Sequence, residues 1–470
     1  MMCNKSILQY ALLLSIVETI LVIFFIGNIS VVIPFFLGVA LLQLSFFDHF
    51  LIRKETIFHP MPFILMVLLF FWYVAPIFSI YTADFLINPA RNINWDFWGY
   101  YTLWVNFFMT LLFFAGKSIG YKKYTNYNIY AFKSKKNIFY WGVFFLTLSL
   151  IFQLYVFNSF GGVLGYINAW GEERSQFDGL GKVFIIAEAF PIILSLAFFA
   201  FLFKNNNLLK YIILFLIIFL IVKILFGGLR GSRSNTVWGV FWIVGIIHIA
   251  FYKIKKYQFF IIILCFSTFM STYALYKSYG VDAFSGEYSL EDTNRFEGNP
   301  YISMLINDFS RSSLNTYQTS QYYEGSNYSI KYGETYLQSL SMIVPPLKYF
   351  FNGYNKDAAG FELYHDVKID PRVDDYYNSR VFGLYGEGIL NFGPIFATLL
   401  IFLYGFVVSR INSYSLSLNP NDARLFFVPF ITNMCMVFMI SDSNNIIFFV
   451  IKNALVVWIM FMLITEKRKI

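Results

Sequence analysis

The stretch LLKYIILFLIIFLIVKILF, residues 208–226, decides the fold class of this chain. Lys210 and Lys223 are its only charges, and its length matches the ~20 apolar residues with which a helix crosses a bilayer. Comparable stretches recur along the 470 residues, of which 58% are hydrophobic and only 13% charged. Soluble domains are about 25% charged, so an ordinary soluble enzyme and a disordered chain are excluded. The composition indicates a multi-span membrane protein.

We predict an all-α polytopic membrane protein with about twelve transmembrane helices. The range is eleven to fourteen because the stretches 236–252 and 425–440 are short. The first stretch is long and no small-residue cleavage site follows it, so it is interpreted as a span and not as a signal peptide. The stretches are roughly 6–26, 29–47, 61–82, 97–116, 137–157, 183–203, 208–226, 236–252, 258–277, 389–409, 425–440 and 445–465.

The loop charges predict the orientation. With a cytoplasmic N-terminus, the cytoplasmic segments hold 19 Lys and Arg and the short outer loops hold 5. Cytoplasmic loops are enriched in these residues, so both termini are predicted to be cytoplasmic. The net charge of +8 is then mainly a topology signal, and no nucleic-acid partner is expected.

One long polar segment, residues 278–388, separates the predicted spans of 1–277 from those of 389–470. It carries 8 basic and 15 acidic residues, and its many tyrosines argue against disorder. We expect a folded cap on the outer face, with an interfacial helix near 336–350 that Pro345 and Pro346 interrupt.

Arginine is concentrated on the predicted outer side, where the positive-inside rule disfavours it. The sharpest case is the Gly-rich turn GGLRGSRS at 227–234, with Arg230 and Arg233. Glycine permits close backbone approach, and a helix starting near Asn235 would direct its N–H groups to the same place. The turn is either an anion site or a hairpin whose arginines reach lipid phosphates.

Further outer arginines have two interpretations each. Arg174, in a short Gly-rich loop, is either a site residue or a partner of a neighbouring glutamate. Arg295, Arg311 and Arg372 lie in the acidic segment, where they either bind ligand or pair with surface carboxylates. Arg380 directly precedes the motif VFGLYGEG at 381–388 that enters the next predicted span.

Glu387, at the mouth of that span, is costly without a partner or a function. It is either a general base that orients an acceptor hydroxyl or a carboxylate that stabilises the helix N-terminus.

Other polar residues give weaker signals. Glu18, Glu188, Lys223 and Lys452 lie inside apolar stretches, where charged residues are functional candidates. His365 is the only histidine of the outer segment, either a base or a surface residue. The three cysteines and the acidic residues form no metal-binding or phosphate-loop motif, so we expect no metal and no cofactor.

Aromatic rings beside carboxylates suit sugars, whose CH faces stack on rings while their hydroxyls bind polar groups. Outer-face arginines suit a diphosphate, which they bind with two parallel hydrogen bonds. A glycan attached to a lipid diphosphate presents both chemistries at one depth. Such a substrate needs no nucleotide for glycosyl transfer.

The sequence resembles the Wzy-type polysaccharide polymerases, the oligosaccharide repeat-unit polymerases. The resemblance is carried by the Gly-rich loop around Arg174 and by the plan of many spans with one long late outer loop. An Arg-x10-Gly spacing described for some members fits Arg372 and Gly383. The other motifs are GGLRGSR at 227–233, YGETYLQSLSMIVPP at 332–346 and RVFGLYGEGILNFGP at 380–394.

The resemblance implies a GT-C-like membrane glycosyltransferase in the bacterial inner membrane, with the large loop periplasmic. It would transfer a growing glycan from undecaprenyl diphosphate to the non-reducing end of another lipid-linked repeat unit. On this hypothesis Arg230 and Arg233, with Arg174 and Arg311, bind the diphosphate. Glu387 and Arg380 border the reacting sugars, and the glycan-binding candidates are Arg372, Tyr385, His365 and Arg295.

Besides these substrates, membrane lipids and a chain-length-regulating co-polymerase are the partners to consider. Two alternatives remain open. One is the sister ligase that transfers finished O-antigen to lipid A core. The other is a lipid-linked oligosaccharide flippase or transporter, in which intramembrane charges would line a central path.

Overall fold

The computed structural model describes most of the chain. The described residues are 2–26, 32–81, 93–124, 128–172, 180–228, 233–255, 257–258, 261–262, 264, 268, 313–344, 346–347, 355–371, 374 and 381–469.

Long apolar helices dominate the described residues. Nine of them are long and apolar enough to cross a membrane, and two shorter apolar helices lie at Leu8–Ile23 and Thr236–Phe251. The predicted α-helical, multi-pass class is confirmed at this level. Eleven of the predicted stretches coincide with described helical segments, whereas 258–277 lies mostly outside the described residues.

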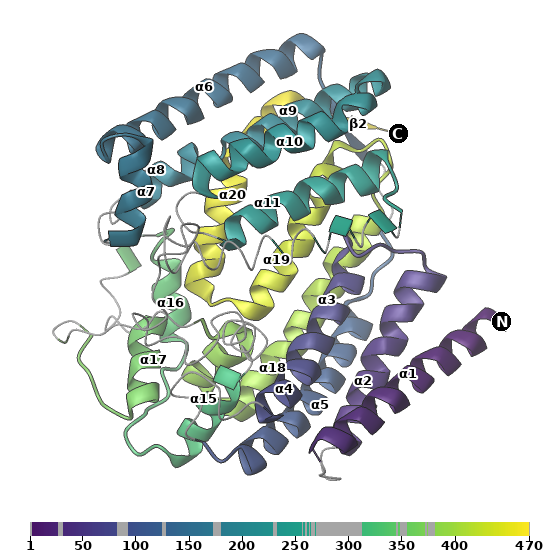
Figure 1. Ribbon diagram of the computed structural model, residues 1–470, viewed down its shortest axis with the longest axis vertical. Helices are drawn as coiled ribbons and strands as arrows, with labels where there is room; N and C mark the ends of the chain where they lie inside the picture. The colour runs from purple at the N-terminus through teal and green to yellow at the C-terminus, as the bar shows by residue number, and fades with distance from the viewer. Residues whose placement is uncertain are drawn as a thin grey trace. The chain divides into compact units, whose positions relative to one another are not determined.

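The chain divides into two compact units, of which unit 1 comprises Met1–Lys123, Glu291–Leu416 and Met434–Ile447. Its short helices α15 and α17 pack against the first part of α18 (Figure 1). The interfacial helix predicted near 336–350 stays a prediction: α16 ends at Leu340, and residues 345 and 348–354 lie outside the described residues. The helices of unit 1 are α1 (Met2–Ile26), α2 (Val32–Phe47), α3 (Pro60–Leu69), α4 (Ala75–Tyr81), α5 (Trp95–Gly120), α15 (Ser313–Glu324), α16 (Glu334–Leu340), α17 (Lys356–His365) and α18 (Gly383–Leu416), with π-helical turns at Asp48–Ile52 and Phe70–Val74.

The most extensive helix contact of unit 1 joins α5 to α18. Gly116 and Gly120 form a small-xxx-small pair on α5, and Gly405 lies opposite on α18. A Cβ atom at any of these glycines would collide with the backbone of the other helix. Small residues therefore let the two backbones meet closely, as in other membrane helix pairs.

Unit 2 comprises Tyr124–Leu290, Ser417–Asn433 and Phe448–Ile470. The helix α6 packs against α8 and α9. The helices are α6 (Lys135–Ser159), α7 (Val163–Glu172), α8 (Gly181–Ala187), α9 (Phe190–Lys204), α10 (Ile212–Lys223) and α11 (Arg233–Ile246), with 3-10 turns at Asn206–Tyr211 and Ala423–Phe427 and π-helical turns at Ile224–Gly228 and Ile247–Phe251. Two further helices, α19 (Val428–Ile440) and α20 (Ser443–Ile464), contribute residues to both units.

A small sheet in unit 2 departs from the all-α expectation. Strand β1 (Asn128–Phe132) pairs antiparallel with β2 (Thr465–Lys469), and the register sets Asn128 opposite Lys469 and Phe132 opposite Thr465. The partners lie more than 330 residues apart in sequence. Local pattern reading could not connect them.

Candidate functional site: a polar junction of helix N-termini

The structure describes three of the sequence-predicted site residues with their side chains, Glu387, Tyr385 and His365. Arg233 is the first residue of α11, but its side chain is outside the description. The remaining candidates lie outside the described residues, namely Arg174, Arg230, Arg295, Arg311, Arg372 and Arg380. The predicted diphosphate site therefore stays a prediction.

The helix α18 is broken at Gly393 and Pro394, where the sequence predicted one continuous span over 389–409. Gly393 has φ 77° and ψ 167°, a conformation open almost only to glycine. A Cβ at Gly388 would lie 2.9 Å from the Cβ of Ala397. Residues nine apart in a straight helix are about 13 Å apart along its axis. The segment 383–392 therefore folds back on the long segment that follows Pro394.

The break frees carbonyl groups, and a neighbouring loop binds them. Pro394 has no N–H for the carbonyl of Leu390. That carbonyl instead accepts the Lys331 N–H at 3.1 Å and the Tyr328 hydroxyl at 2.6 Å. The Tyr332 N–H donates to the Asn391 carbonyl at 3.0 Å. The loop at 328–332 thus completes the backbone hydrogen bonding of the broken helix.

Glu387 lies on the folded-back segment and is only 1% exposed. Its carboxylate accepts three hydrogen bonds, from the Thr335 hydroxyl at 2.9 Å, the Ser443 hydroxyl at 2.6 Å and the Ser443 N–H at 2.7 Å. Ser443 is the first residue of α20. Glu387 therefore stabilises a helix N-terminus, but that of α20 and not the one expected from its own sequence position.

Asp442 makes the reciprocal contact. Fully buried, it accepts the N–H groups of Phe382 at 2.7 Å and Gly383 at 3.3 Å, at the start of α18. Its other oxygen lies 3.0 Å from the Lys356 ammonium. Each of the two meeting helix N-termini is thus neutralised by a carboxylate from the other chain segment.

We call the set Glu387, Asp442, Ser443, Thr335 and Lys356 the polar junction. Burial alone would lower the pKa of Lys356, but Asp442 and Asp357 together raise it above its ordinary value. Lys356 is therefore a fixed positive charge between carboxylates. With two carboxylates and one ammonium, the polar junction has groups that can accept a proton from a bound hydroxyl compound and groups that can donate one to it.

Tyr336 on α16 borders the polar junction. Burial, together with the charges of Glu387 and Asp442, raises the pKa of its phenol. Its hydroxyl has no hydrogen-bond partner among the described residues. Buried polar groups are normally paired, so this hydroxyl is a donor that a ligand could engage.

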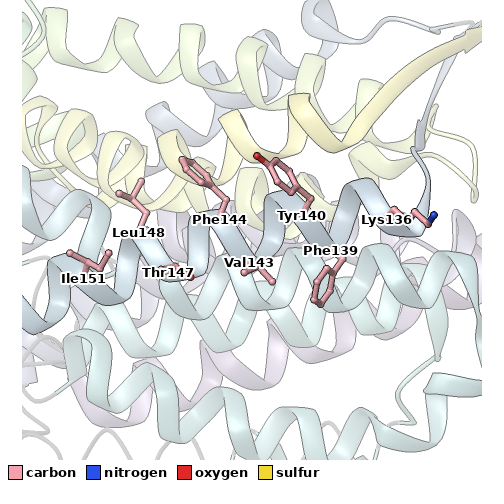
Figure 2. Close-up of a pocket in the computed structure, with 8 residues that line it drawn as sticks. All are labelled: Lys136, Phe139, Tyr140, Val143, Phe144, Thr147, Leu148 and Ile151. Atoms are coloured by element: carbon pink, nitrogen blue, oxygen red, sulfur yellow. The ribbon is translucent and has the colours of Figure 1, made fainter.

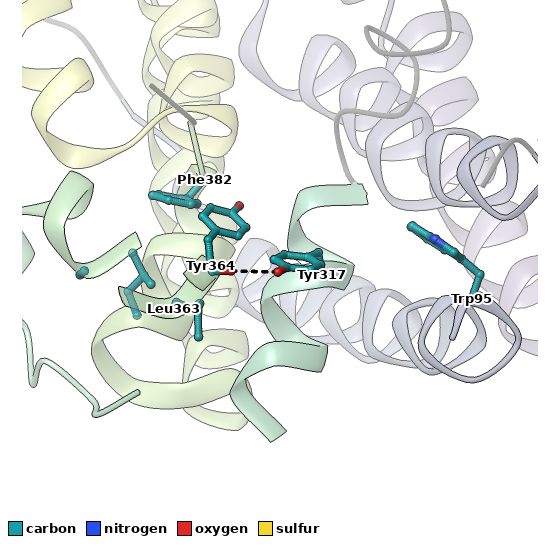
Figure 3. Packing of buried hydrophobic residues seen from close by; sticks show 7 residues of the cluster. Trp95, Tyr317, Leu363, Tyr364 and Phe382 are labelled. Atoms are coloured by element: carbon teal, nitrogen blue, oxygen red, sulfur yellow. Dashed lines mark hydrogen bonds between the residues drawn. The ribbon is translucent and has the colours of Figure 1, made fainter. Parts of the chain in front are cut away.

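An aromatic core supports the polar junction, and Figure 3 shows it. Tyr317 of α15 stacks on Tyr364 of α17 at a ring distance of 5.1 Å, and its hydroxyl donates to the Tyr364 carbonyl at 3.1 Å. Phe382 stacks on the other side of this pair at 5.7 Å from Tyr364. The core fixes Phe382, whose N–H binds Asp442.

The other two described candidates, Tyr385 and His365, make no described contact with the carboxylates of the polar junction. Tyr385 is buried at 4% exposure, and its hydroxyl has no hydrogen-bond partner among the described residues. His365 ends α17, is exposed, and packs its ring against Phe361 at 4.4 Å. It makes no described contact with Glu387.

Sequence reasoning missed Asp442, Ser443, Thr335 and Lys356. One local signal for the first two was present, since Asp-Ser after an apolar run is a typical helix start. Their pairing with Glu387 and Phe382, more than 50 residues away, had no local signal.

Unit 2 contains a separate buried ion pair. Lys452 of α20 binds Glu188, which lies between α8 and α9. Both residues are at most 5% exposed. Two of the intramembrane charges noted in the sequence are thus partners of each other, as charges in apolar surroundings require.

A groove of about 700 Å³ on unit 2 is lined along α6 by apolar side chains (Figure 2). Lys136 lies at one end and Ile151 at the other. None of the site candidates lines it. Its composition is that of a lipid-facing surface.

In comparisons with protein families, characterised proteins and solved structures, the chain has no significant match.

Proposed function

We propose that the protein polymerises lipid-linked oligosaccharide repeat units. The reaction breaks the bond between the donor's anomeric carbon and the undecaprenyl diphosphate oxygen. It forms a glycosidic bond to a hydroxyl of another lipid-linked unit, which loses its proton. Undecaprenyl diphosphate leaves.

The observation that carries the proposal is the place of the motif at 380–394. Its described part forms the folded-back segment that ends at Gly393 and Pro394 and holds Glu387 in the polar junction. The tyrosine-bearing helices α15, α16 and α17 all contact α18, which comprises this segment and the long segment after Pro394. A buried carboxylate therefore lies next to tyrosine-bearing helices at the start of a span, and this supports the proposal.

In the proposed mechanism, Arg230 and Arg233, with Arg174 and Arg311, stabilise the charge on the leaving diphosphate. Glu387 is the leading carboxylate for the acceptor hydroxyl, with Arg380 bordering the reacting sugars. Because Ser443 and Thr335 already fill its oxygens, Glu387 must release one of these donors to take a proton. We propose that the Tyr336 hydroxyl, which has no hydrogen-bond partner among the described residues, donates to the acceptor beside Glu387.

The first experiment is lipid-linked glycan analysis in a deletion strain. A polymerase predicts accumulation of single repeats on undecaprenyl diphosphate and on lipid A core. Complementation with Arg230→Ala or Arg233→Ala should leave single repeats and no long chains. Lys204→Ala, at the exposed end of α9, is the matched charge-removing control and should restore full ladders. Normal ladders from both arginine variants would overturn the diphosphate assignment.

A second set of variants separates a base from a positioning carboxylate at Glu387. If it is the base, Glu387→Gln abolishes polymer while Ser443→Ala and Thr335→Val keep most of it, since they remove only competing donors. If it positions helices, all three variants lose polymer in proportion to lost thermal stability. Near-normal polymer from Glu387→Gln removes it as the base.

The flippase or transporter alternative is favoured by one observation, the buried Lys452–Glu188 pair beside a helix break. Broken helices with intramembrane charges occur in transporters. Loss of outward-facing repeats in the deletion strain would support it. Accumulation of polymer that is not joined to lipid A core would instead support the ligase alternative.

A further inference from the structure

An aromatic and acidic surface lies where the start of α5 meets the end of α15 in unit 1. Trp98 and Tyr323 are stacked, with ring centroids 5.7 Å apart and planes at 12°. The Trp98 indole N–H donates to Glu324 at 2.7 Å. Tyr101 packs edge-on against both rings, with its hydroxyl 3.5 Å from that of Tyr323.

This surface is buried on the side of Trp98 and exposed on the side of Tyr323. Trp98 is 6% exposed, whereas Tyr323 is 46% exposed. Beneath them, the buried Thr102 hydroxyl donates to the Thr316 hydroxyl at 3.1 Å and ties α5 to α15. Trp98 stacks on one face of Tyr323, and Tyr322 and Tyr101 pack edge-on to its ring at 5.3 and 6.2 Å, so the exposed part of the ring lies away from these three side chains.

Two features distinguish the surface from a lipid-facing aromatic belt. Glu324 is exposed, and an exposed carboxylate is strongly disfavoured in hydrocarbon. Its second oxygen accepts no hydrogen bond from a described residue. A polyhydroxylated ligand can use this arrangement, in which a carboxylate oxygen of Glu324 lies beside the exposed ring of Tyr323.

We propose that Tyr323, Glu324 and Tyr101 form a subsite for one sugar ring of the glycan. The apolar CH face of the sugar stacks on the exposed part of the Tyr323 ring. Its hydroxyls donate to the second oxygen of Glu324 and bind the Tyr101 hydroxyl. The negative charge of Glu324 selects neutral or amino sugars and disfavours uronic acids. This subsite rests on the proposed function for its biological substrate, but not for its binding chemistry.

The test is direct binding of the full-length protein in lipid nanodiscs to an array of neutral, amino and acidic bacterial oligosaccharides. Wild type should bind neutral or amino members. Tyr323→Ala should weaken that binding about tenfold, since about 1.4 kcal/mol of lost stacking corresponds to that factor. Tyr323→Phe, which keeps the ring, should retain it. Glu324→Gln should weaken it less and reduce the discrimination against acidic members.

Tyr121→Ala is the matched control, because Tyr121 is 62% exposed and follows the far end of α5. It should bind like wild type. Absence of oligosaccharide binding by wild type, or equal binding by Tyr323→Ala, overturns the subsite. A deletion strain with normal glycan chains overturns the proposed polymerase while leaving this binding result intact, so the two failures are distinguishable.

Discussion

At two helix breaks in the described part of the chain, a proline leaves a carbonyl without its helical N–H donor, and different groups bind that carbonyl. In unit 1, Pro394 frees the Leu390 carbonyl, and the loop at 328–332 supplies a backbone N–H and a phenol. In unit 2, Pro191 frees the Ala187 carbonyl, and the Ser149 hydroxyl of α6 lies 2.8 Å from it and 2.7 Å from the Ile186 carbonyl.

The carboxylates at the two breaks also have different kinds of partner. Glu387 is held by hydroxyls and a helix N–H, and Glu188 is held by the ammonium of Lys452. The unit 1 break depends on exchangeable neutral donors and on a loop outside the spans. The unit 2 break depends on side chains of the helices themselves. We infer that the first can open for a ligand and that the second is structural.

The largest expected effect is that of Lys452→Met. It removes the cation from a buried carboxylate, and breaking a buried pair typically costs about 3–5 kcal/mol. Thermal unfolding in detergent, followed by circular dichroism, should show a large drop. The double variant Lys452→Met with Glu188→Gln should recover most of it. A double variant no more stable than the single one contradicts the structural role.

Gly393→Ala should have the next largest effect. The backbone conformation costs about 1–3 kcal/mol for a residue with a Cβ, which would also lie 2.7 Å from the Tyr322 hydroxyl. Gly142→Ala on α6 is the control, because its nearest neighbour would be 3.6 Å away. That variant should be neutral or slightly stabilising. Equal unfolding temperatures for the two variants would disprove the break.

Ser149→Ala and Tyr328→Phe compare the breaks directly. Ser149→Ala leaves a buried carbonyl without its hydroxyl donor, which costs about 1–3 kcal/mol. Tyr328→Phe should cost less, about 0.5–1.5 kcal/mol, because the Lys331 N–H still binds the Leu390 carbonyl. The reverse order in thermal unfolding would show that the loop contributes less than its contacts indicate.

The smallest effect near neutral pH is the change of stability with pH that Lys356 causes. Its pKa is raised above the ordinary 10.5, so its stabilising interaction with Asp442 is fully present below that pH. The stabilisation is lost as pH rises through the folded-state pKa. Alkaline titration of thermal stability should therefore show a steeper loss in wild type than in Lys356→Met. Parallel curves would mean that the ammonium does not stabilise the polar junction.

Apolar length predicted the helices well because bilayer thickness sets it, and the stretch 208–226 is helical as expected. The Gly-Pro pair of the motif NFGP indicates the break at Gly393, but hydropathy alone does not detect a break at a single proline. The contacts of Glu387 with Ser443, and of Lys452 with Glu188, depend on tertiary packing between distant segments. No periodicity encodes such contacts, so the sequence could nominate Glu387 but not its partners.

The pairing of β1 with β2 also constrains membrane sidedness. Strands that share a ladder occupy one compartment, so the segment at 128–132 and the C-terminal residues 465–469 must face the same side. The number of crossings between them is then even, a requirement that the eight predicted stretches in this interval satisfy. A membrane-impermeant label that reaches a cysteine placed at Asn128 should therefore also reach one placed at Lys469.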